Sequence, residues 1–147
     1  MRTSQNICAV AIVLVLTVFG VNALASNGRV GFDIGTFPVY AADFLDKTNA
    51  SGNIFTTDQW GGYLIYRFDG RLKVFLDGRS DFYGRDLLET YSRVISVKQG
   101  WDKVLTQYDV RFVLVPPDSS LASVLQSRAD WKCIYSDSVS AVYERAV

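Results

Sequence analysis

The chain has 147 residues, of which 49% are hydrophobic and 20% charged, a composition typical of one folded domain rather than a disordered chain. Its 15 basic and 15 acidic residues balance to a formal net charge of zero, which argues against a nucleic-acid partner. The absence of histidine excludes Ser-His-Asp and Cys-His nucleophiles and His-ligated zinc. The two cysteines, Cys8 and Cys133, are too few for a disulfide framework or a four-thiolate zinc site. We expect no metal and no cofactor.

The first element in chain order is an uncharged apolar segment. Residues 3–28 contain no charge, and residues 7–25 are almost entirely apolar. At 1.5 Å per helical residue the apolar run spans about 28 Å, close to the thickness of a bilayer's hydrocarbon core. We therefore predict a transmembrane helix or signal anchor within residues 1–25, with Arg2 on the cytoplasmic side. Residues 23–25 also fit the end of a cleavable signal peptide, so cleavage stays open as an alternative.

Both interpretations place the rest of the chain outside the cytoplasm. The predicted location is the inner (plasma) membrane, crossed once, with a periplasmic or otherwise extracytoplasmic carboxyl-terminal domain. Residues 26–37 contain three glycines and no helical period, which indicates a linker. The extracytoplasmic domain is predicted over residues 38–147.

Hydrophobic periodicity predicts alternating helices and strands in that domain. The nearly continuous apolar run of residues 111–115 is typical of a central strand that is buried on both faces. The expected fold class is α/β, a three-layer sandwich with a mainly parallel sheet closed by a carboxyl-terminal antiparallel hairpin. The expected helices cover residues 38–50, 59–68, 87–95, 101–108 and 121–125, and the expected strands residues 53–56, 72–76, 111–115, 131–135 and 139–143.

Two polar, glycine-containing segments follow the first two predicted strands. In α/β sheets, ligands tend to bind beyond the carboxyl ends of the strands, so the two segments should converge on one edge. We predict a pocket there for a polar, hydroxyl-rich ligand, with Trp60 as an apolar platform and Arg79 and Asp81 as hydrogen-bonding groups. The candidate ligand-binding residues are Trp60, Gly61, Gly62, Tyr63, Asp77, Arg79, Asp81 and Tyr83.

The same residues also fit a purely structural interpretation. Asp-Gly pairs are common in turns, and Arg79 could form an ion pair with Asp77 or Asp81. Trp60 could belong to the core, with Gly61 and its neighbour in a close helix contact. The two aspartates lack a third oxygen ligand at a fixed spacing, so we assign neither a metal site nor catalytic residues.

Several segments resemble a known type of domain. They are FPVYAADFL, NIFTTDQWGGYLIYRF, KVFLDGRSDFYG, WDKVLTQYDVRFVLVPPDSSLA and WKCIYSDSVSAVYER, which together cover about residues 37–145. They resemble the carboxyl-terminal extracytoplasmic domain of bacterial multi-spanning membrane proteins of the GT-C glycosyltransferase type. WGGYLI and the DGRxDxY pattern are the most specific parts.

The resemblance implies that the apolar segment is equivalent to the last transmembrane helix of such proteins. The order of elements is also distantly similar to the soluble domain of oligosaccharyltransferase catalytic subunits, in which a WWDYG motif recognises the acceptor. Residues 60–63 occupy the comparable stretch but lack the aspartate of that motif.

The catalytic carboxylates of GT-C enzymes lie between early transmembrane helices, which a chain with one predicted span does not contain. The implied function is a non-catalytic accessory or acceptor-side domain of a glycosyltransferase-like membrane protein, either a fragment or a split product, that is inactive alone. Its partners would be the membrane, the transmembrane part of the transferase and a glycan or peptide acceptor. Two alternatives stay open: a stand-alone, membrane-anchored binding module for glycan or peptide, and a structural domain that packs on partner membrane helices.

Overall fold

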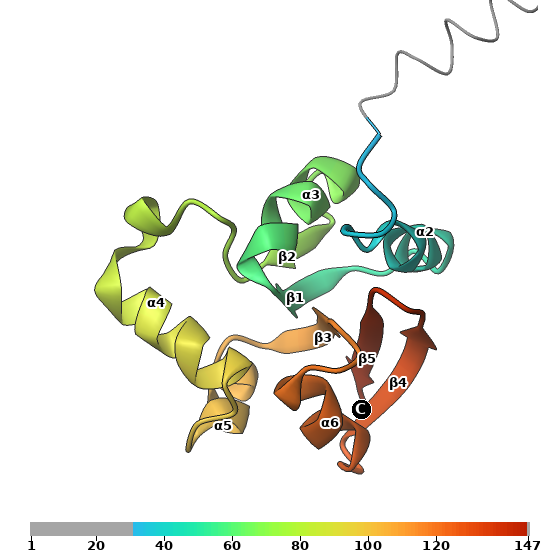
Figure 1. Cartoon of the computed structure of the whole chain (residues 1–147). Helices are drawn as coiled ribbons and strands as arrows, with labels where there is room; N and C mark the ends of the chain where they lie inside the picture. The colour runs from blue at the N-terminus through green and yellow to red at the C-terminus, as the bar shows by residue number, and fades with distance from the viewer. Residues whose placement is uncertain (1–30, 147) are drawn as a thin grey trace, which may run out of the picture. The chain divides into compact units, whose positions relative to one another are not determined.

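The computed structural model of the chain describes residues 31–146 (Figure 1). The predicted membrane segment, residues 7–25, lies outside the described residues. Within the described part, no helix is both long and apolar enough to cross a membrane. The compact unit begins at Asp33, so the last five residues of the predicted linker belong to it.

The elements follow one another in the predicted order, and each predicted helix and strand is present. The last helix is capped by Ser119, whose hydroxyl accepts a hydrogen bond from the backbone N–H of Ala122. The elements are α2 (Val39–Lys47), β1 (Gly52–Thr56), α3 (Asp58–Phe68), β2 (Leu72–Val74), α4 (Ser80–Ile95), α5 (Trp101–Gln107), β3 (Val110–Val115), α6 (Ser120–Gln126), β4 (Trp131–Ser136) and β5 (Ala141–Arg145).

The five strands form one mixed sheet in the order β2-β1-β3-β5-β4. β1 pairs in parallel with β2 and β3, whereas β5 pairs antiparallel with β3 and with β4. The predicted hairpin at the carboxyl terminus is confirmed. The expectation of a mainly parallel sheet is wrong, because β5 returns beside β3 and makes two of the four pairings antiparallel.

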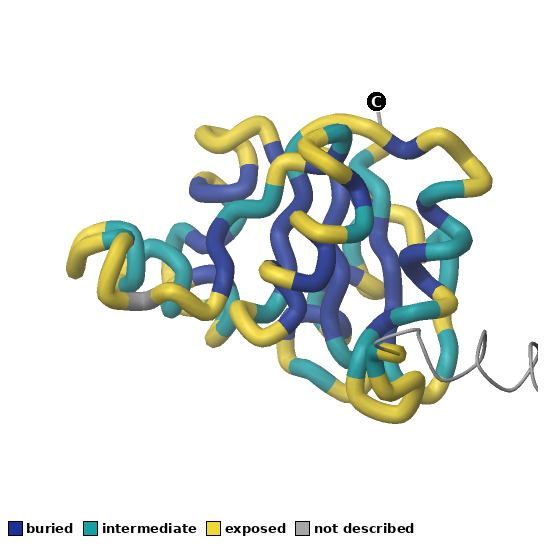
Figure 2. Tube along the Cα trace, turned by 90° about the horizontal axis from the view of Figure 1, so that it is seen from above, coloured by how far each residue is buried: buried dark blue, intermediate teal, exposed yellow. Residues whose placement is uncertain are grey.

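Helices cover the two faces of this sheet. In Figure 1, α2 and α3 lie on one side of the strands and α4, α5 and α6 on the other. Figure 2 shows that the strands at the centre are buried along most of their length. Val113 and Leu114, adjacent in β3, face opposite sides of the sheet and are both fully buried, as the apolar run predicted.

A continuous cluster of buried side chains fills the space between the sheet and α4, α5 and α6. At its margin the partly buried Tyr91 ring of α4 stacks on Phe55 of β1, with ring centroids 5.4 Å apart. The cluster contains Phe55, Val94, Trp101, Val104, Leu105, Val110, Val113, Val115, Leu121, Ala122, Leu125, Trp131, Ala141 and Tyr143.

Two predicted boundaries differ from the structure near the candidate loops. β2 ends at Val74 rather than at residue 76, although the Phe75 N–H still donates to the carbonyl oxygen of Ile54. α4 begins at Ser80, seven residues earlier than predicted, and it is broken at Gly84. Gly84 has φ 71° and ψ 165°, a conformation that a residue with a side chain adopts only with strain. Residues 80–83 therefore form a separate turn ahead of the main helix.

Candidate functional site

The two predicted loops do lie side by side, because Gly61 brings α3 directly against the segment after β2. A Cβ atom on Gly61 would lie 2.4 Å from the carbonyl oxygen of Leu76 and 2.7 Å from the Cα of Asp77. Such distances leave no room for a side chain. A glycine at this position therefore sets how closely the first turn of α3 approaches Asp77.

Asp77 is the centre of the polar contacts at this edge of the sheet. It is only 4% exposed. Its Oδ1 accepts hydrogen bonds from the backbone N–H of Arg79 (3.1 Å) and from the Tyr83 hydroxyl (2.9 Å). The Arg79 side chain adds Nε, 3.0 Å from Oδ2, and Nη2, 2.8 Å from the same oxygen.

The hydrogen bonds from Arg79 hold the pKa of the Asp77 carboxyl below its usual value. Burial acts in the opposite direction but is outweighed. Asp77 is therefore a charged carboxylate at neutral pH, although its side chain is almost entirely removed from solvent.

Arg79 extends from the buried Asp77 to the surface of the domain. Its side chain is 68% exposed, in contrast to its buried partner. The guanidinium carbon lies 5.8 Å from the centre of the Phe82 ring, within the range of a cation–π contact. Phe82 is itself 84% exposed. The edge of the sheet therefore presents an oriented guanidinium next to an exposed aromatic ring.

The remaining residues predicted from this loop divide between two places. Tyr83 belongs to the Asp77 cluster through its hydroxyl. Asp81 is exposed and lines an open groove along α4, together with Gly84, Arg85, Leu88, Glu89 and Ser92.

Trp60 and Tyr63, which were expected to line the pocket, lie in the interior of the domain. Trp60 is 5% exposed, and its indole N–H donates a 2.9 Å hydrogen bond to the carbonyl oxygen of Thr36. The Tyr63 ring packs against Phe37 with centroids 5.6 Å apart, and burial raises the pKa of the Tyr63 hydroxyl. The platform role predicted for Trp60 is therefore not available in this structure, and the core interpretation describes both residues. Gly62 has open space around it on the outer side of α3.

Two residues at this edge were not selected from the sequence. Phe82 is one, and its signal was a large apolar residue within an otherwise polar run. Tyr91 is the other: its hydroxyl oxygen accepts the backbone N–H of Asp58 at 3.0 Å, and burial raises its pKa. Tyr91 therefore caps the start of α3, whereas the buried hydroxyl of Thr57 has no hydrogen-bond partner among the described residues.

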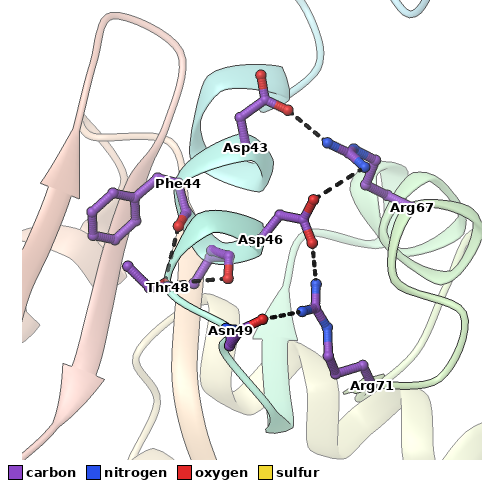
Figure 3. A network of polar contacts seen from close by, with 8 residues as sticks. Asp43, Phe44, Asp46, Thr48, Asn49, Arg67 and Arg71 are labelled. Carbon is purple, nitrogen blue, oxygen red and sulfur yellow. Dashed lines mark hydrogen bonds and ion pairs between the residues drawn. The ribbon is translucent and has the colours of Figure 1, made fainter.

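A second polar network joins α2 to α3 on the same side of the sheet (Figure 3). Arg67 Nη2 lies 2.7 Å from Asp43 Oδ1, and Arg67 Nη1 lies 3.6 Å from Asp46 Oδ2. Arg71 also binds Asp46, and its Nη1 donates to Asn49 at 3.4 Å. Because the acidic residues come from α2 and the arginines from α3 and the turn after it, the network fixes the packing of the two helices.

The polar groups described above are better suited to binding a ligand than to catalysing a reaction. Within residues 31–146, no group of three His, Cys, Asp or Glu side chains is placed to hold a metal ion. The Asp77 oxygens already accept hydrogen bonds from Arg79 and Tyr83, so we assign them no nucleophilic or acid–base role. Comparison of the chain with protein-family models, curated proteins and solved structures finds no match.

Proposed function

We propose that this chain is a non-catalytic, extracytoplasmic accessory or acceptor-side domain of a glycosyltransferase-like membrane protein. In this proposal the domain is held at the inner membrane by the apolar segment of residues 7–25, and it has no activity alone. The observation that carries the proposal is the exposed Arg79 guanidinium, which the buried Asp77 holds beside the exposed Phe82 ring.

The asymmetry of the ion pair supports a binding role. An exposed ion pair contributes little to folding, because both side chains lose freedom and water screens their charges. Here one partner is buried and has additional hydrogen bonds, so the other is restricted before any ligand arrives. Less conformational entropy is then lost on binding, which favours affinity.

The chemistry of the patch favours a neutral, hydroxyl-rich ligand. Asp77 compensates the charge of Arg79, so a ligand gains hydrogen bonds from the guanidinium rather than a net ionic attraction. Phe82 adds an apolar surface that suits the C–H face of a ring. A sugar residue offers both hydroxyl oxygens and an apolar face, and we therefore place a glycan acceptor ahead of a peptide.

A binding panel tests this assignment. The full chain in detergent is titrated with neutral oligosaccharides and with acidic peptides. Phe82→Ala should weaken oligosaccharide binding about tenfold or more, since anchoring aromatic side chains contribute strongly to recognition. Tyr40→Ala is the matched control, because Tyr40 is an exposed aromatic residue on α2. Preferential binding of acidic peptides would contradict the glycan assignment, and binding that is insensitive to Phe82 would contradict the site.

The location is tested separately. Intact-mass measurement of the chain from the membrane fraction should show that residues 7–25 are retained. A mature amino terminus at Ser26 would contradict the membrane anchor. Only the proposal of a binding module would then remain.

A second candidate is a domain that packs on partner membrane helices. Exposed apolar side chains on the outer layer favour it: Tyr40 on α2, and Ile65 and Tyr66 on α3. The same panel separates the two candidates, because a structural domain would bind none of the ligands. In that case Tyr40→Ala, and not Phe82→Ala, should weaken co-purification with the transmembrane partner.

A further inference from the structure

A cavity lies at the other end of the parallel strands from Arg79. It has a volume of about 630 Å³ and is formed where β1 and β3 begin and β5 ends. This volume is within the range of small-molecule sites in proteins. The polar side chains that line it are those of Ser51, Asn53, Asp109, Arg111 and Arg145.

An irregularity in strand pairing shapes this cavity. Asn53 pairs with Val110, but the next residue of β1, Ile54, pairs with Phe112, so Arg111 is an extra residue in β3. A bulge of this kind bends the strand and redirects the side chains beside it. Gly52, with φ +115°, starts β1 at the same point. The cavity is therefore built into the backbone of the two strands.

Arg145 is the best-fixed cation in the cavity. Its Nε donates to the carbonyl oxygen of Val110 at 3.1 Å, and its Nη1 donates to the Thr106 hydroxyl at 3.2 Å. The guanidinium carbon also lies 4.8 Å from the centre of the Trp131 ring. Among the described residues, no carboxylate lies within ion-pair distance of Arg145. Its position is thus restricted without a carboxylate in contact with it. Asp130, which is paired with Arg128, interacts with Arg145 only through longer-range electrostatics.

The other polar groups limit which anion fits. Arg111 is already paired with Glu144 at 2.9 Å, so Arg145 supplies the available positive charge. Asp109 lines the same cavity and would repel a second negative charge, which disfavours a phosphate dianion. The side-chain amide N–H of Asn53 donates to the backbone carbonyl oxygen of Tyr108. The side-chain oxygen of Asn53 is thus left as an acceptor for a hydroxyl or amino group.

We propose that this cavity binds a small carboxylic acid that also carries a hydroxyl or amino group. Arg145 holds the carboxylate through its guanidinium, for which a planar carboxylate is a good geometric match. Asp109 and Asn53 accept hydrogen bonds from the second group. The proposal is independent of the oligosaccharide site at Arg79, because the two sites lie at opposite ends of the parallel strands.

Calorimetric titration of the full chain in detergent with glycolate and with glycine tests the proposal. A dissociation constant of about 1 mM or tighter is expected for at least one of them. Arg145→Gln should weaken binding about tenfold or more, because the charged hydrogen bonds are lost. Arg93→Gln is the matched control, since Arg93 is an exposed arginine of α4 that does not line the cavity.

A second pair of variants protects the test against misfolding of the Arg145 variant. Ser51 is exposed at the cavity, so Ser51→Asp adds a negative charge there without disturbing the core, and Ser51→Asn is its neutral control. Only Ser51→Asp should weaken binding of the acids, and Phe82→Ala should leave it unchanged. The proposal would be overturned if the wild type bound neither acid, or if Arg145→Gln and Ser51→Asp bound the acids as tightly as the wild type does. Tighter binding of inorganic phosphate than of glycolate would also overturn it.

Discussion

The Asp77 carboxylate is bound by two side-chain nitrogens of Arg79, Nε at 3.0 Å and Nη2 at 2.8 Å from Oδ2. Asp77 is buried, whereas Arg79 is largely exposed. The ion pair therefore has one partner in the interior of the domain and the other at its surface. Removal of either partner should therefore have a different effect: loss of the acid affects folding, and loss of the base affects what the surface can bind.

Asp77→Asn should lower the free energy of unfolding by about 1–3 kcal/mol at neutral pH, because a buried, fully hydrogen-bonded carboxylate is lost. Its pKa in the folded state lies below the ordinary value of 3.8, so its contribution is present above that pH and is lost as the pH falls below it. In denaturant unfolding between pH 6 and pH 2, the free energy of unfolding should therefore fall less steeply with decreasing pH for Asp77→Asn than for the wild type. Asp86→Asn, at an exposed position of α4, should retain the wild-type slope.

The two adjacent glycines of α3 should respond in opposite ways to the same change. Gly61→Ala places a Cβ against the backbone of Leu76 and should destabilise the fold by about 1–3 kcal/mol. Gly62→Ala meets no atom within 4 Å and should stabilise it by about 0.5–1 kcal/mol, because alanine is the better helix former. Thermal unfolding of both variants checks this, and a similar shift in both would contradict the close contact at Gly61.

The central strand offers a test of the core. Leu114 is fully buried in β3, between β1 and β5, so Leu114→Ala should cost about 2–5 kcal/mol by leaving a cavity. The domain should then melt well below the wild type. An unchanged melting temperature would show that β3 is not central.

The sequence was sufficient to predict the elements because their signals are local. The apolar run of residues 111–115 and the alternation in the last two strands depend only on neighbouring residues. The position of β5 between β3 and β4 depends on long-range pairing, and no local pattern determines it. The sheet therefore contains more antiparallel pairing than was predicted.

The candidate site was predicted in part for a similar reason. The convergence of the loops around Asp77 follows from the parallel order of β1 and β2, and the structure confirms it. The burial of Trp60 depends on residues 33–37, which pack on α3 and were interpreted as a linker. Phe82 lies in the turn before the break at Gly84, and no helical period reveals that break.

Tyr135 should make the fold sensitive to alkaline pH. Burial, together with its 2.8 Å hydrogen bond to Asp137, raises the pKa of Tyr135 to about 12. Because this value lies above the ordinary 10.0, the contribution to stability is complete below pH 10 and is lost as the pH rises through 12. Tyr135→Phe should therefore lose less stability than the wild type between pH 9 and pH 11 in urea unfolding. An identical decline in the two proteins would contradict the shift, and Tyr66→Phe provides a control at an exposed tyrosine.

The most direct test of the account is a paired measurement of stability and binding on Arg79→Lys. Lysine keeps a positive charge for Asp77 but lacks the planar fork, so the free energy of unfolding should change by less than about 1 kcal/mol. Calorimetric affinity for neutral oligosaccharides should fall about tenfold, whereas Arg85→Lys in the neighbouring groove should leave it unchanged. A large loss of stability with unchanged affinity would contradict the account, because Arg79 would then serve the fold and not a ligand.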